Sequence, residues 1–220
     1  MPVASKPTAP PLTDWRNRMR EHLLAAPDHR PHSWRLGGTL MSPTAAMREA
    51  LDAKPAPAAV LIPVLDRDDG PAVLLTRRAA GLRLHAGQIS FPGGRLEHAE
   101  TDPLTAAIRE TTEETGITAR FIEPLGFLPD HLVLTGFRIT PVVAYIRPGF
   151  TLKIDSREVA DVFEVPLAFI LDLANYQPVR RELRGFAVDA LDLPYGDRLI
   201  WGATAGMLRT LRETLGAMGS

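Results

Sequence analysis

The apolar positions in the first third of the chain predict two helices and a pair of strands. Residues 14–26 and 42–53 space their apolar side chains at helical intervals. The side chains expected to face inward are Trp15, Met19, Leu23, Leu24, Met47 and Leu51. A nearly continuous apolar run at 58–65 resumes at 71–76 after a turn rich in aspartate, which predicts a hairpin of buried strands.

The remainder of the chain alternates strand and helix patterns. We expect helices at 105–115, 165–173 and 203–215, and strands at 121–128, 139–146 and, as one or two segments, 177–188. Gly116 stands where a left-handed residue would end the helix at 105–115. This order of elements predicts an α/β (α+β) fold, an α/β/α sandwich with a mixed central sheet.

Length and composition favour one domain with appendages. A chain of 220 residues that is 45% hydrophobic can bury one good core and is short for two. Residues 1–13 are rich in proline and polar side chains, so we expect a loose leader there. The predicted division is 1–57 as a leader and flanking helices packed on the domain, and 58–220 as the functional domain.

Charge and motif content remove several classes of function. A net charge of -1 gives no field that would attract nucleic acid or an anionic membrane. The absence of cysteine excludes disulfides and thiolate metal sites, and the histidines show no zinc spacing. The sequence contains no nucleophile elbow and no nucleotide-binding P-loop. It also contains no signal peptide and no apolar run of membrane-spanning length, so we expect a cytoplasmic protein. The sequence does not determine the oligomeric state.

Three glutamates form the most conspicuous chemical feature. Glu110, Glu113 and Glu114 stand at i, i+3 and i+4, so a helix places their carboxylates on one face. Two like charges about 5 Å apart repel by roughly 3 kcal/mol at an effective dielectric near 20, and a bound Mg²⁺ or Mn²⁺ would reverse that repulsion. An ordinary solvated acidic face eased by Arg109 is the alternative interpretation of the helix alone.

The loop before this helix decides between the two interpretations. A glycine pair at 93–94 follows a short apolar segment, Glu100 comes next, and the full run reads GRLEHAETDPLTAAIRETTEETGI. This run resembles the Nudix box, written G-x5-E-x7-R-E-U-x-E-E-x-G-U with U apolar. It departs from the box in having one extra residue between Glu100 and Arg109, and Thr111 at the first apolar position.

The resemblance implies a loop and helix that hold one or more divalent cations. The implied ligands are Glu110, Glu113 and Glu114, with the Gly94 carbonyl as another and Glu100 assisting through water. Arg109 is implied to orient the glutamates. Relatives use either a box glutamate or a carboxylate on a later loop as the general base, so Glu158 and Glu164 are further candidates, and the choice stays open.

A second pattern lies just upstream of the box. The sequence resembles L-L-T-x-R-[SA]-x3-R-x3-G-x3-F-P-G-G, which marks the coenzyme A pyrophosphatase branch of the Nudix family and accompanies the longer Glu-to-Arg spacing. The matching positions are Leu74, Leu75, Thr76, Arg78, Ala79, Arg83, Gly87 and 91–94. The implied reaction is cleavage of the diphosphate of coenzyme A or its thioesters into 3′,5′-ADP and 4′-phosphopantetheine or its acyl form.

The same pattern suggests the substrate-binding residues. Arg78 and Arg83 could each give a charge-assisted contact to phosphate, and Gly93 and Gly94 let the backbone approach the ligand. Gln88 could reach the ligand or only brace the loop. A groove for the pantetheine arm could use four apolar side chains, for which a packing role is the safer interpretation: Phe127, Leu132, Phe137 and Trp201.

Two alternatives remain beside the coenzyme A hypothesis. A Nudix hydrolase of another nucleoside diphosphate compound, such as ADP-ribose or NADH, would share the metal site but not the upstream pattern. A non-catalytic domain that senses a nucleotide would be expected to lack the acidic ligands, yet Glu110, Glu113 and Glu114 are all present.

Overall fold

A mixed β-sheet runs through the middle of the molecule in a computed structural model that describes residues 14–30, 35–36, 55–82, 85–133, 135–183 and 185–216. Within these residues the sheet has 9 strands, in the order β1-β7-β8-β2-β3-β4, with β5 paired to β2, β6 to β8 and β9 to β3. The strands are β1 (Arg35–Leu36), β2 (Ala56–Leu65), β3 (Ala72–Arg78), β4 (Ile89–Ser90), β5 (Gly93–Arg95), β6 (Ile122–Phe127), β7 (His131–Val133), β8 (Phe137–Ile146) and β9 (Val159–Pro166).

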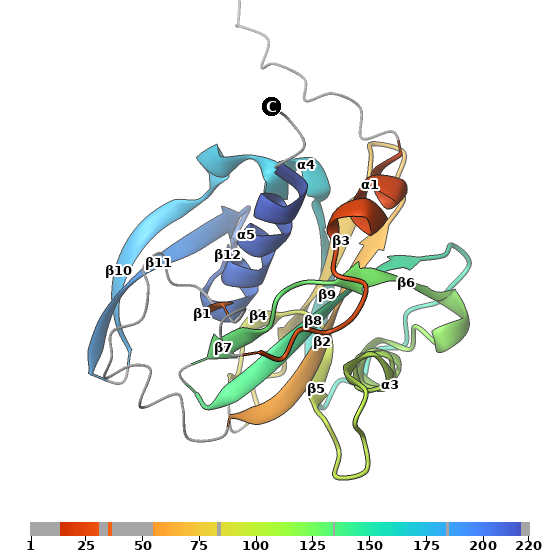
Figure 1. Cartoon of the computed structure of the whole chain (residues 1–220), viewed down its shortest axis with the longest axis horizontal. Coiled ribbons are helices and arrows are strands. Elements are labelled where there is room, and N and C mark those ends of the chain that lie inside the picture. The colour runs from red at the N-terminus through yellow and green to blue at the C-terminus, as the bar shows by residue number, and fades with distance from the viewer. Residues whose placement is uncertain are drawn as a thin grey trace, which may run out of the picture.

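Helices cover both faces of this sheet (Figure 1). They are α1 (Trp15–His22), α3 (Pro103–Thr115), α4 (Leu167–Leu171) and α5 (Gly202–Gly216), with short 3-10 turns at Ala119–Phe121 and Leu173–Asn175. Apolar residues of α3 pack on one face, and those of α1, α4 and α5 pack on the other. A smaller sheet of β10 (Gln177–Leu183), β11 (Phe186–Tyr195) and β12 (Arg198–Ile200) lies beside α5. The predicted α/β class with a mixed central sheet is confirmed.

The continuous apolar run in β2 follows from burial on both faces of the strand. Leu61 packs on the α3 side, whereas its neighbour Ile62 packs on the α1 and α5 side, and neither is exposed. β2 pairs in parallel with β8 along its full length. A strand in that position needs apolar side chains at successive residues rather than at alternate ones.

The predicted hairpin forms, but its two strands separate after a short stretch of pairing. β2 and β3 are antiparallel only at Val64 with Val73 and Leu65 with Ala72. Beyond that point the same edge of β3 pairs with β4, and residues 58–60 of β2 pair with β5 instead. The other edge of β3 pairs with β9 along its whole length. The splayed hairpin therefore brings the glycine pair of β5 against the centre of the sheet.

Several predicted boundaries are wrong. The short strands β1, β4, β5, β7 and β12 were not predicted, and neither was the longer strand β9. The first helix ends at His22 rather than 26, because Leu23 is extended and Leu24 forms a β-bridge with Phe127. The helix expected at 165–173 is shorter, since β9 occupies the chain up to Pro166. β9 lies at the outer side of β3 and mixes polar with apolar residues, so no clear run of strand residues marked it.

The other elements agree with their predictions. The strands at 121–128 and 139–146 and the closing helix at 203–215 are present within one or two residues, and the stretch at 177–188 contains two strands. The helix predicted at 42–53 lies outside the described residues. Trp15 and Met19 of α1 are buried in the core, while a division of the chain after residue 57 stays a prediction.

Candidate active site

Helix α3 is fixed at both ends by local contacts. Asp102 caps its start by accepting from the backbone N–H groups of Leu104 at 3.1 Å and Thr105 at 3.2 Å, and Pro103 occupies the first turn. Gly116 ends it with a φ of 78°, the left-handed cap expected from the sequence. The helix therefore begins two residues before the predicted position and presents its carboxylates from a rigid backbone.

Thr111, the polar residue at an apolar box position, is satisfied within the helix. It is fully buried, and its hydroxyl donates to the carbonyl of Ala107 at 2.7 Å. A buried hydroxyl with such a partner avoids the cost of an unpaired polar group. The departure therefore leaves the packing beneath the acidic face intact.

The three glutamates share one face of α3 but lie at different depths. Glu114 is buried with 2% of its surface exposed, whereas 59% of the Glu113 side chain is exposed. Glu110 lies between these extremes. Arg109 joins two of them by donating from Nη1 to Glu110 at 2.9 Å and to Glu113 at 3.2 Å.

Arg109 is itself held by Glu100. Its Nε and Nη2 donate to the two oxygens of Glu100 at 2.9 and 3.0 Å, and Nη2 also reaches the carbonyl of Arg95 at 3.2 Å. Hydrogen bonding from Arg109 is the main reason that the pKa of Glu100 is lowered. Since both carboxylate oxygens are engaged, this geometry favours Glu100 as a brace for Arg109 over the expected role beside a metal. The extra residue in the box does not prevent this contact.

Glu114 is a carboxylate whose charge lacks sufficient compensation. Burial, followed by the charges of Glu110 and Glu158, raises its pKa to about 8, against the opposing charge of Arg78 and a backbone hydrogen bond from Gly93. Arg78 Nη1 stands 3.8 Å from Glu114 Oε1. Glu114 Oε2 and Arg78 Nε are buried without a hydrogen-bond partner.

The unpaired Glu114 oxygen fits a divalent cation at this face. Hard oxygen donors suit Mg²⁺ or Mn²⁺, and a cation would neutralise the charges that raise the pKa of Glu114. Within the described part of the chain, no three histidine, aspartate or glutamate side chains are gathered closely enough to hold a metal ion. A cation here would therefore have to draw the glutamates of α3 together.

Two adjacent glycines of β5 place the loop against the sheet and against Glu110. Gly93 has a φ of 154°, and a Cβ there would lie 2.6 Å from the Val60 Cα of β2. A Cβ on Gly94 would lie 2.5 Å from the Glu110 carboxyl carbon. Gly93 is required because a side chain there would collide with the backbone of β2. Gly94 is required because a side chain there would collide with the Glu110 carboxylate.

Alanine at these two positions should therefore produce different defects. We expect Gly93→Ala to lower the free energy of unfolding by about 2–4 kcal/mol, because strained backbone atoms must move. Gly94→Ala should retain most of that stability but displace the Glu110 carboxylate, weakening Mn²⁺ binding by about tenfold or more. Thermal denaturation and Mn²⁺ titration of both variants measure this; equal loss of stability in the two would contradict it.

The loop between β8 and β9 brings Glu158 to the site. The N–H groups of Lys153 and Asp155 donate to the last carbonyls of α3, on Thr115 at 2.8 Å and Glu114 at 3.1 Å. The chain then turns, and the Glu158 carbonyl accepts from Ala79 at 2.8 Å. The charge of Glu158 contributes to the raised pKa of both Glu110 and Glu114. Because backbone contacts position this residue, the sequence could name Glu158 as a candidate base but could not show its proximity to Glu110 and Glu114.

Glu164, the other late candidate, lies in β9 and forms an ion pair away from these carboxylates. Both of its oxygens accept from Arg67 in the turn between β2 and β3, at 2.8 and 2.6 Å. Its backbone pairs with Leu74 of β3. Glu164 therefore lies within a strand, and its ion pair with Arg67 disfavours it as a base.

The candidate substrate-binding residues are only partly brought together. Arg78 faces Glu114, whereas Gln88 braces the loop, since its Oε1 contacts His85 Nδ1 at 2.8 Å and its carbonyl accepts from Arg78 N. Arg83 lies outside the described residues. Phe127 and Leu132 are buried in the core, which disfavours them as groove residues. The guanidinium carbon of Arg95 lies 4.7 Å from the centre of the Phe137 ring, and that of Arg181 lies 5.0 Å from the centre of the Trp201 ring.

Comparison with known proteins places this site in a family. The sequence model of the NUDIX domain matches residues 54–184, which include β2 to β9 and α3. The chain belongs to the Nudix hydrolase family. It is 42% identical over 159 residues to a protein named uncharacterized Nudix hydrolase NudL from Cronobacter sakazakii, covering 72% of this chain and 82% of the relative. The protein of that name from Escherichia coli is 41% identical over the same shares of each chain.

A solved Nudix structure supports the fold. The crystal structure of the Nudix hydrolase RenU from M. smegmatis has a TM-score of 0.51 and 21% identity, over 75% of this chain and 88% of that one. None of the helices in the described ranges is long and apolar enough to cross a membrane.

Proposed function

We propose that this Nudix protein hydrolyses the diphosphate bond of coenzyme A or its thioesters, giving 3′,5′-ADP and 4′-phosphopantetheine or its acyl form. The observation that carries the hydrolytic part is the buried Glu114 with its unpaired oxygen, set beside Glu110, Glu158 and Arg78. A cation bound there and a diphosphate bound to the cation would together balance these charges.

The residues that would hold the cation lie on α3 and the glycine loop. We assign Glu110, Glu113 and Glu114 as carboxylate ligands and the Gly94 carbonyl as a further one. A bound Mg²⁺ or Mn²⁺ supplies neutralisation of the diphosphate oxygens and lowers the pKa of water. Arg109 is proposed to hold Glu110 and Glu113 in place, and Glu100 is proposed to hold Arg109.

Two further side chains are proposed to act on the reacting groups. Glu158 is exposed, lies on a separate loop, and is close enough to help raise the pKa of both Glu110 and Glu114. We therefore assign it as the base that removes a proton from the attacking water. Arg78 lies beside the Glu114 carboxylate, so its guanidinium group is placed to contact a diphosphate bound at the same face. Gly93 and Gly94 would leave room for the substrate, and Gln88 would support Arg78 through the loop.

The choice of coenzyme A rests on the sequence pattern that ends at the glycine pair. The pattern places Arg78 at the end of β3, and the β4 loop returns it to the site through backbone bonds of Arg78 with Gln88 and Gly87. Because Arg78 is committed to the carboxylate face, recognition of a second phosphate would fall to Arg83 or to other side chains. ADP-ribose or NADH remains the alternative substrate class.

A substrate panel tests this proposal. Coenzyme A, acetyl-coenzyme A, dephospho-coenzyme A, ADP-ribose and NADH would be assayed with Mg²⁺ and with Mn²⁺, and the products identified by mass. We expect the highest kcat/KM for a coenzyme A compound, and about tenfold less for dephospho-coenzyme A if the 3′-phosphate makes a charge-assisted contact. Dominant cleavage of ADP-ribose would overturn the substrate assignment, and binding without turnover of any compound would indicate a nucleotide-sensing domain.

A further inference from the structure

A buried aspartate holds a histidine on the segment that follows α1. The Asp130 side chain is fully buried; its Oδ1 accepts from the Thr140 hydroxyl at 2.7 Å, and its Oδ2 lies 2.8 Å from His29 Nδ1. Arg138 Nε stands 3.7 Å from Oδ2. With these donors around it the carboxylate acts as an acceptor, so His29 Nδ1 carries the hydrogen. The bond fixes both the tautomer and the orientation of the imidazole ring.

This cluster lies on the same face of the sheet as the α3 carboxylates. Thr140 of β8 is directly opposite Ala59 of β2, and Ala59 is directly opposite Gly94 of β5. Opposed residues in a sheet share a face, and the Glu110 carboxylate packs over Gly94 on that face. Two strand spacings separate Gly94 from Thr140, which is about 10 Å.

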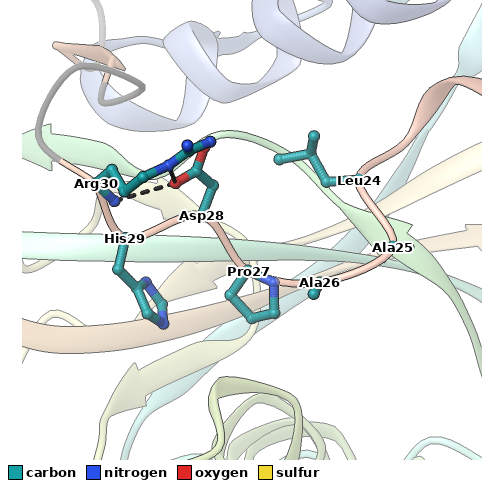
Figure 2. A pocket seen from close by; sticks show the side chains of 7 residues that line it. All are labelled: Leu24, Ala25, Ala26, Pro27, Asp28, His29 and Arg30. Atoms are coloured by element: carbon teal, nitrogen blue, oxygen red, sulfur yellow. Dashed lines mark hydrogen bonds and ion pairs between the residues drawn. The ribbon is translucent and has the colours of Figure 1, made fainter.

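His29 is accessible as well as oriented. It belongs to the segment of residues 24–30, which lines an open pocket of about 720 Å³ (Figure 2). Its side chain is 41% exposed although its partner Asp130 is fully buried. Figure 2 shows Asp28 and Arg30 projecting on one side of this segment and the His29 ring projecting on the other, the side of the view on which α3 lies.

We infer that His29 is a specificity-determining residue that binds an oxygen on the ribose–phosphate part of the nucleotide half of the substrate. A diphosphate held at α3 would extend its nucleoside across β2 toward β8, and the separation of the two clusters is about that of a nucleoside. The imidazole offers a donor, and Arg138 offers donors and a positive charge, all suited to phosphate or hydroxyl oxygen. Asp130 is the positioning residue. This inference rests on the proposed function.

Product binding tests the inference without requiring turnover. 3′,5′-ADP and AMP would be titrated by calorimetry into wild type and two variants in the presence of Mg²⁺. His29→Asn keeps an amide donor for Asp130 but removes the outer ring nitrogen, so we expect about tenfold weaker binding of 3′,5′-ADP. His29→Gln places an amide near the outer nitrogen and should recover binding to within about threefold. A smaller change for AMP assigns the contact to the 3′-phosphate; an equal change assigns it to the ribose.

The controls distinguish failure of the His29 inference from failure of the proposed function. His22→Asn changes an exposed histidine on α1 and should bind as wild type does. Asp130→Asn should weaken binding as His29→Asn does, with kcat changed far less than KM. If the wild type cleaves coenzyme A, equal affinities of wild type and His29→Asn for 3′,5′-ADP would overturn the inference. A wild type that cleaves ADP-ribose and spares coenzyme A would instead overturn the proposed function, and ADP-ribose titrations would then decide the role of His29.

Discussion

Replacing Glu114 with glutamine should lower kcat by about a thousandfold or more while leaving the protein folded. The substitution keeps the shape of the side chain but removes the carboxylate that we assign to the cation, and such a change costs several kcal/mol of transition-state stabilisation. The metal-free variant should be as stable as wild type or more so, because a buried and poorly compensated carboxylate becomes a neutral amide. Steady-state kinetics with Mg²⁺, Mn²⁺ titration and thermal denaturation measure these three effects.

A second glutamate of the same domain provides the matched control. Glu164 pairs with Arg67 and lies near the end of β9 that is farther from Glu158. The kcat of Glu164→Gln should therefore stay near that of wild type. Near-normal turnover of Glu114→Gln would remove the metal assignment from α3. A large loss in Glu164→Gln would return that residue to the set of candidate bases.

The sequence was sufficient to predict the elements that have strong local patterns. The apolar runs of β2 and β8 and the closing helix α5 follow from burial, and α3 follows from its box and its glycine cap. β9 was missed because its polar residues serve ion pairs at the outer side of β3, as Glu164 does with Arg67. A strand that depends on such tertiary pairs carries little signal of its own.

The site shows the same division between local and distant contacts. Helical spacing alone placed Glu110, Glu113 and Glu114 on one face, but it could not show that only Glu114 would be deeply buried. Glu158 reaches the site through backbone bonds at the end of α3, and His29 reaches Asp130 across 101 residues of sequence. Pairs of this kind are created by the topology of the sheet, and a single sequence does not reveal them.

Stability of the metal-free protein should fall as the pH rises from about 5 to 8. The pKa of Glu114 is raised from 4.5 to about 8 by burial, so between these values the folded state retains a proton that the unfolded chain has lost, and raising the pH favours unfolding. The full effect above pH 8 is on the order of 3–5 kcal/mol, or roughly 10 °C in Tm. Glu110, whose pKa is also raised by burial, adds to the loss of stability in the same direction.

Thermal melting in EDTA from pH 5 to 9 should show this decline in stability. Mg²⁺ should oppose the decline increasingly at high pH, because the cation binds the ionised carboxylates. Glu114→Gln should flatten the metal-free profile, and a variant that kept the wild-type slope would place the titration elsewhere in the molecule.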